Sequence, residues 1–135
     1  MKTSVSLRVV RGYAVIVGSM DLATGLALVA APAFTLAQMG AVIPGPEALG
    51  FVRFSGAFVA AVGASYFVGL VRGSEARLRG ALEFTLLARA AAGMFTGVAV
   101  ATGLFDRAWL AVTATDLTCV AVQAWMLKKG IEGDE

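Results

Sequence analysis

Four long apolar stretches, each with few charges, dominate the chain. About 20 apolar residues in helical form are enough to cross the ~30 Å hydrocarbon core of a bilayer. In lipid such stretches must be helical, because nothing there can hydrogen-bond an open backbone. The pattern predicts helices over 9–31, 51–71, 82–104 and 108–127. We therefore expect one all-α domain over residues 1–135, an integral membrane four-helix bundle.

The segments between the stretches differ in length and charge. Residues 32–50 contain three prolines and a single charge, Glu47, and could include a short interfacial helix around 34–38. Residues 72–80 (RGSEARLRG) are short and basic, and residues 105–107 are short enough for a tight turn. Connections this short leave no room for a second domain.

Basic residues predict the orientation, because cytoplasmic loops of membrane proteins carry an excess of lysine and arginine. With four helices, both chain ends and the 72–80 connection lie on one side of the membrane. That side holds eight basic residues, and the opposite side holds two, Arg53 and Arg107. The eight are Lys2, Arg8, Arg11, Arg72, Arg77, Arg79, Lys128 and Lys129. We expect both termini in the cytoplasm and a multi-pass protein of the plasma membrane.

The first stretch has a second interpretation, as a secretory signal peptide with a cleavage site at Ala31–Ala33. Its apolar run is longer than the usual ~7–15 residues of such a peptide, and it contains Asp21. We therefore expect the segment to be the first membrane helix.

Composition supports a membrane protein and excludes several kinds of site. Hydrophobic residues make up 59% of the chain and charged residues 15%, against roughly 45–50% and 25% in soluble domains. The chain has no histidine and one cysteine, Cys119. We therefore expect neither a haem nor a metal cofactor. The net charge is only +2 and the basic residues follow the membrane topology, so we expect no nucleic-acid partner.

Small residues at helical spacing predict close packing, on which membrane helices depend. Gly93 and Gly97 form a GxxxG motif in the third stretch, and Gly56, Ala60 and Ala64 recur every four residues in the second. We interpret both sets as contacts inside one bundle. The alternative is a docking face for another subunit, in a homo-oligomer or a larger membrane complex.

Three charges lie where lipid would surround them: Asp21, Arg89 and Asp116, in the first, third and fourth stretches. Each would cost roughly 2.5–3.5 kcal/mol at the bilayer centre, so we expect them to face inward. The helix rise puts the aspartates at one level and Arg89 about 8 Å nearer the cytoplasm. A direct pair would need an extended arginine or a shifted helix. Thr96 and Gln123 complete the expected polar network.

This network has two interpretations. In the first it is a structural lock, in which Arg89 pairs with one aspartate and fixes the register of the bundle. In the second it is a binding or proton-handling site near the midplane. Two aspartates and one arginine do not balance, so the second aspartate could take up and release a proton.

Several short sequences resemble the DoxX-like small four-helix bacterial membrane proteins. They are Val52–Ala57 (VRFSGA) with Gly63, the basic connection 72–80, Leu87–Arg89 and Asp116–Leu117. The resemblance covers most of the chain and implies a bacterial inner-membrane protein. The group includes a membrane subunit associated with thiosulfate:quinone oxidoreduction, which implies an accessory subunit near a quinone. No catalytic residue carries over.

We expect a non-enzymatic membrane protein, acting as an accessory subunit or binding a hydrophobic molecule, a lipid or a quinone, inside the bundle. Asp21, Arg89 and Asp116 would orient the polar head of that molecule. One alternative is a small proton-coupled transporter that uses Asp21 or Asp116 as the carrier. Another is an intramembrane enzyme with Asp116 as acid and Asp21 as base.

Overall fold

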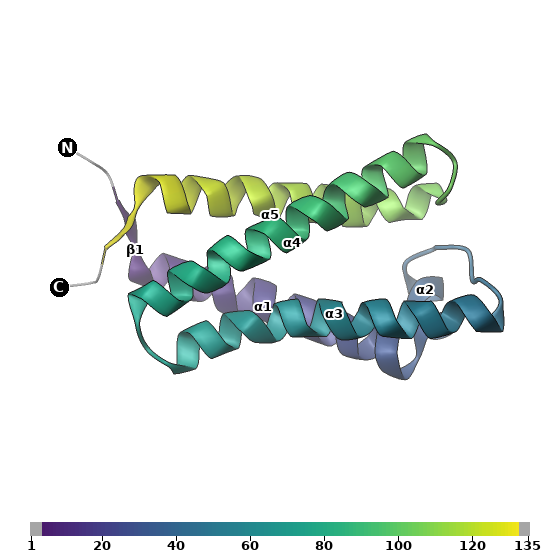
Figure 1. Cartoon of the computed structure of the whole chain (residues 1–135), viewed down its shortest axis with the longest axis horizontal. Coiled ribbons are helices and arrows are strands. Elements are labelled where there is room, and N and C mark those ends of the chain that lie inside the picture. The colour runs from purple at the N-terminus through teal and green to yellow at the C-terminus, as the bar shows by residue number, and fades with distance from the viewer. Residues whose placement is uncertain (1–3, 133–135) are drawn as a thin grey trace.

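The structure, a computed structural model, describes residues 4–132 and is helical over most of that length (Figure 1). Its helices are α1 (Leu7–Ala30), α2 (Pro32–Gln38), α3 (Pro46–Val71), α4 (Glu75–Ala101) and α5 (Leu110–Lys129). A short 3-10 helix, η1 (Arg107–Trp109), leads into α5, and the strands are β1 (Val5–Ser6) and β2 (Ile131–Glu132). The predicted all-α fold with four helices long and apolar enough to cross a membrane is confirmed. Lys2, one of the eight basic residues, lies outside the described residues.

Three of the long helices, α1, α3 and α4, begin before the apolar stretches that predicted them. α4 starts at Glu75 and not near residue 82, because Ser74 caps it by accepting a hydrogen bond from the backbone N–H of Arg77. α3 starts at Pro46, where proline suits the first helical turn. At the other end of α4, Gly103 turns the chain with a φ of +75°. Hydropathy marks the part of a helix suited to lipid, whereas these polar and turn residues set its ends.

The helices form two antiparallel hairpins, α1 with α3 and α4 with α5 (Figure 1). α1 and α3 approach backbone to backbone at glycines. A Cβ atom on Gly25 would lie 2.2 Å from the backbone nitrogen of Ala60, and one on Gly63 would lie 2.4 Å from that of Leu22. Gly56 lies in the same contact, where its Cβ would meet the backbone oxygen of Gly25 at 2.9 Å. Glycine is required at these positions because no side chain fits.

The α4–α5 hairpin packs through side chains. A Cβ atom on Gly93 would meet the side chain of Leu117 at 3.0 Å, and one on Gly97 would meet that of Thr113 at 3.3 Å. The GxxxG motif therefore lies inside the bundle, at the looser of the two hairpin contacts. Ala64, the last member of the predicted stripe on α3, is half-buried.

The two hairpins pack together at the end that holds the termini and diverge toward the other end (Figure 1). The shared core near the termini includes Val10, Tyr66, Leu82 and Met126, all almost fully buried. β1 pairs with β2 in parallel, which ties the start of the described chain to its end. Both ends therefore lie at the same end of the molecule, as four membrane crossings require.

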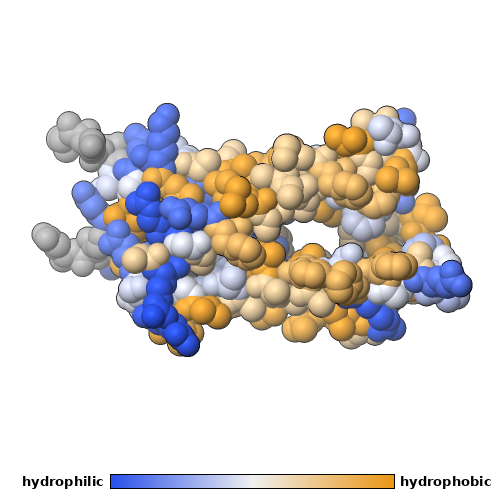
Figure 2. Space-filling model, viewed as in Figure 1, coloured by the Kyte–Doolittle hydropathy of each residue, from blue (hydrophilic) through white to orange (hydrophobic). Residues whose placement is uncertain are grey.

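The surface is suited to lipid. Hydrophobic residues cover most of the face shown in Figure 2, and hydrophilic residues gather at the end with the termini, with a smaller group opposite. Large apolar side chains point outward: Phe51 is 75% exposed, Ile16 71% and Leu87 69%. Soluble monomers rarely expose apolar patches of this extent. The four helices and this surface indicate a multi-pass membrane protein.

Two polar side chains fasten the end away from the termini. Asp106 accepts hydrogen bonds from the backbone N–H of Ala108 at 2.8 Å and from that of Val42 at 2.9 Å. It thus caps η1 and joins the α2–α3 loop to the α4–α5 connection. Arg53 donates from Nη1 to the backbone oxygen of Val29 and so satisfies a carbonyl of the last turn of α1.

We expect Asp106→Ala to lower the free energy of unfolding by about 1–2 kcal/mol, because it removes a helix cap and a charge-assisted bond between the hairpins. Unfolding by sodium dodecyl sulfate in mixed micelles would measure the change. Thr102→Ala is the matched control, since the Thr102 hydroxyl bonds only to backbone oxygens of its own helix. Equal stability of the two variants would contradict the prediction.

Candidate functional site

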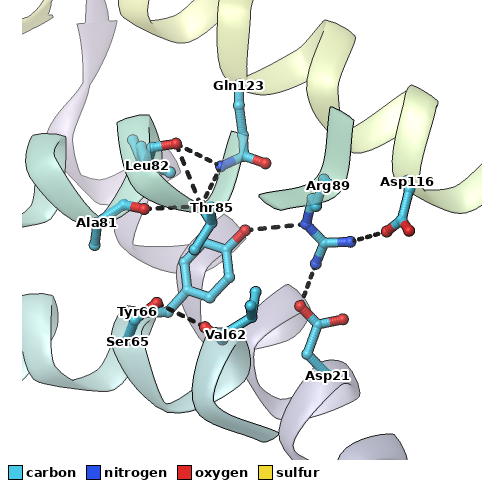
Figure 3. A network of polar contacts seen from close by, with 10 residues as sticks. All are labelled: Asp21, Val62, Ser65, Tyr66, Ala81, Leu82, Thr85, Arg89, Asp116 and Gln123. Atoms are coloured by element: carbon cyan, nitrogen blue, oxygen red, sulfur yellow. Dashed lines mark hydrogen bonds and ion pairs between the residues drawn. The ribbon is translucent and has the colours of Figure 1, made fainter. Parts of the chain in front are cut away.

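The three intramembrane charges meet at one point, which we call the ion cluster (Asp21, Arg89 and Asp116). Arg89 donates from Nη1 to Oδ1 of Asp116 at 2.7 Å and from Nη2 to Oδ2 of Asp21 (Figure 3). Its Nε donates to the hydroxyl of Tyr66 at 3.3 Å. These residues come from α4, α5, α1 and α3, so every long helix contributes a side chain. One guanidinium links both hairpins.

The contact with both aspartates corrects the expected lock, in which Arg89 pairs with only one. It also shows that the arginine side chain bridges the depth offset predicted from helix rise. α4 crosses the bundle at an angle (Figure 1), which an estimate based on rise alone leaves out. The Arg89 side chain is 3% exposed, and those of Asp21 and Asp116 are 11% and 13% exposed. A buried charge needs such partners, and each partner here is itself charged or polar.

Tyr66 belongs to the site although it was not among the residues predicted from the sequence. It is fully buried, and its ring packs edge-on against Tyr13 with the ring centres 6.4 Å apart. A tyrosine deep inside a membrane span needs a partner for its hydroxyl, and that requirement is the signal that could have identified it. Its hydroxyl oxygen accepts from Arg89 and holds the third side of the guanidinium.

Gln123 and Thr96 lie apart from the ion cluster, so the predicted five-residue network separates into three groups. Gln123 is fully buried, and its Nε2 donates to Oγ1 of Thr85 at 2.7 Å, toward the end with the termini. Thr96 lies toward the other end, where its hydroxyl bonds to that of Thr113 at 2.8 Å. Both groups join α4 to α5. Gln123 and Thr96 are both buried, but they bond to threonines that were not among the residues predicted from the sequence.

A cavity of about 500 Å³ lies between the hairpins. The ion cluster forms part of its lining, and most of the other lining side chains are apolar, including Phe58, Phe84 and Trp109. Figure 2 shows an opening between the hairpins in the apolar part of the surface, on the side away from the termini. Cavities of roughly 300–1,000 Å³ are typical of sites for small molecules. The arrangement suits a molecule with a polar head and an apolar body.

Among residues 4–132, no three histidine, cysteine or acidic side chains are placed to hold a metal ion together. The candidate site thus offers carboxylates, one guanidinium and hydroxyl groups. Cys119, on α5, is buried in the core.

No family model, curated protein or solved structure matches this chain. The DoxX-like resemblance therefore stays a prediction. The function rests on what the ion cluster and the cavity can do.

Proposed function

We propose that this protein binds a hydrophobic molecule, a lipid or a quinone-like amphiphile, in the cavity between its two hairpins. The observation that carries the proposal is the pairing of an apolar cavity of about 500 Å³ with a charged cluster in its wall. The apolar lining suits the body of such a molecule. The charged and polar groups suit its head, which they would hold by hydrogen bonds that lipid cannot supply.

The position of the cavity favours entry from the bilayer. The opening lies within the apolar surface and not at either polar end (Figure 2). The end with the termini carries most of the basic residues, so by the positive-inside rule it faces the cytoplasm of a plasma or inner membrane. The cavity then lies in the outer half of the bilayer. A ligand could leave part of its apolar body among the lipid chains.

The DoxX-like resemblance favours a more specific role for the same site. It would make the protein an accessory subunit of a membrane oxidoreductase, with the cavity beside or around a quinone. In that role this chain would bind the quinone, and another subunit of the oxidoreductase would transfer the electrons.

A second candidate is a small proton-coupled transporter. It is favoured by the two carboxylates that share one guanidinium and also line the cavity. A proton and a substrate could then compete for the same acidic groups. Substrate flux in proteoliposomes that disappears with Asp21→Asn or Asp116→Asn would favour this function over binding alone.

Filling the cavity tests the proposed function. Ala92 lines the cavity, and a phenylalanine there would occupy the space that the ligand needs. We expect Ala92→Phe to weaken binding of decylubiquinone and oleyl alcohol by roughly tenfold or more, the effect of about 1.4 kcal/mol. Native mass spectrometry of the purified protein with each probe would measure the bound fraction.

Ala91→Phe is the matched control, because Ala91 is an exposed neighbour on the same helix that is not part of the cavity lining. Binding should be unchanged in this variant. If both variants bind the probes as the natural protein does, or if the natural protein binds neither probe, the proposed function is wrong.

A further inference from the structure

The charges around the cavity do not balance. The ion cluster has one cation and two carboxylates, and the described cavity lining contains no other charged residue. Arg53, on α3, does not supply the missing positive charge, because it is bound to carbonyl oxygens at the end of α1. With its three groups ionised, the cluster therefore carries one excess negative charge. Inside a membrane such a charge is costly unless something compensates it.

The excess charge faces the cavity. Arg89 donates from Nε to Tyr66 and from each terminal nitrogen to one aspartate, so three of its five N–H donors are bound to protein groups. Asp116 accepts a hydrogen bond from the guanidinium through Oδ1, and Asp21 accepts one through Oδ2. The second oxygen of each aspartate lies on the side of Arg89 away from Tyr66 (Figure 3). The aspartates are also more exposed than the arginine, so the polar wall of the cavity is negative.

The aromatic lining also favours a positively charged ligand. Phe58, Phe84 and Trp109 line the cavity that contains the ion cluster. Aromatic faces attract cations, most strongly where water is excluded. An anionic head, such as a phosphate or a carboxylate, would meet two carboxylates whose only positive neighbour is already shared between them.

We propose that the ligand of this cavity is a lipophilic cation, a single positive charge carried on an apolar body. This inference rests on the proposed function and narrows its ligand class. The cation would lie near the second oxygens of Asp21 and Asp116, which would neutralise the cluster, and its apolar groups would contact the aromatic walls.

Two probes of the same shape and opposite charge test this inference: tetraphenylphosphonium and tetraphenylborate. Binding of each to the full-length protein in dodecyl maltoside would be measured by equilibrium dialysis, with protein-free micelles subtracted. We expect tetraphenylphosphonium to bind roughly tenfold or more tightly than tetraphenylborate, and Asp116→Asn to reduce that affinity by a similar factor. Ala92→Phe should also abolish cation binding, and Ala91→Phe should leave it unchanged.

The outcomes separate the inference from the proposed function. If the natural protein binds both ions equally or prefers the borate, the cation inference is wrong. A proton that already neutralises one aspartate would give this result. If Ala92→Phe still blocks the neutral probes in that case, the proposed function stands. Cation binding that survives Ala92→Phe would overturn both the cation inference and the proposed function. The comparison of ion signs uses the natural protein, so it holds even if Asp116→Asn does not fold.

Discussion

Arg89→Gln should destabilise the protein more than any other single replacement of a charged residue, by about 3–5 kcal/mol in the free energy of unfolding. The variant leaves Asp21 and Asp116 buried without their shared cation. It also removes a side chain that bonds to three other helices. Unfolding in mixed micelles, with loss of helical signal as the readout, would measure the change.

Arg79→Gln is the matched control. Arg79 is on the same helix and also pairs with a carboxylate, that of Glu83, but these side chains are 50% and 56% exposed. Exposed pairs one helical turn apart contribute only about 0.3–0.5 kcal/mol. If Arg89→Gln were as mild as this control, the ion cluster would not hold the hairpins together.

A triple variant separates lost charge balance from lost packing. Asp21→Asn, Asp116→Asn and Arg89→Gln together replace the ion cluster by neutral groups of similar size. We expect this variant to recover most of the stability lost in Arg89→Gln alone, because removing a whole buried ion set is far milder than removing one partner. Failure to recover would mean that the shape of the arginine, and not its charge, matters most.

The members of the ion cluster could be predicted from the sequence, because any charge inside an apolar span is costly and must face inward. Their partners could not. Helix rise gives the depth of a residue, but the contact between Arg89 and both aspartates also depends on how far α4 rotates and tilts. The same reason explains why Thr96 and Gln123 were placed in this network although they bond elsewhere. Tyr66 was missed because a tyrosine in an apolar span fits packing equally well.

The glycine contacts between helices were also only partly predictable from sequence spacing. The sequence drew attention to glycine pairs four residues apart, as in Gly93 and Gly97. The tightest contact instead uses glycines seven residues apart, Gly18 and Gly25 on α1 and Gly56 and Gly63 on α3. Residues seven apart lie on one face of a helix, as in left-handed coiled coils. Two such pairs on neighbouring helices let the backbones meet, but only the structure shows that they face each other.

Gly25→Ala should therefore be strongly destabilising, although it adds a single methyl group. That methyl carbon would lie 2.2 Å from the backbone nitrogen of Ala60 and 2.6 Å from the backbone oxygen of Gly56. Backbone atoms cannot swing aside as the end of a side chain can, so α1 and α3 must separate. We expect a loss of about 3 kcal/mol, at the upper end of the usual cost of overpacking. The mixed-micelle unfolding measurement would detect it.

Two other glycines provide a graded control for that result. Gly12 is on the same helix with no atom near its missing side chain, so Gly12→Ala should be neutral or stabilise by about 0.5–1 kcal/mol. Gly93→Ala should fall between the two, because the new methyl would meet side-chain atoms of Leu117 that can shift. The order of stability is then Gly12→Ala, Gly93→Ala, Gly25→Ala, from highest to lowest. If Gly93→Ala were the most damaging, the GxxxG motif on α4, and not the glycine contact between α1 and α3, would be the tighter helix interface.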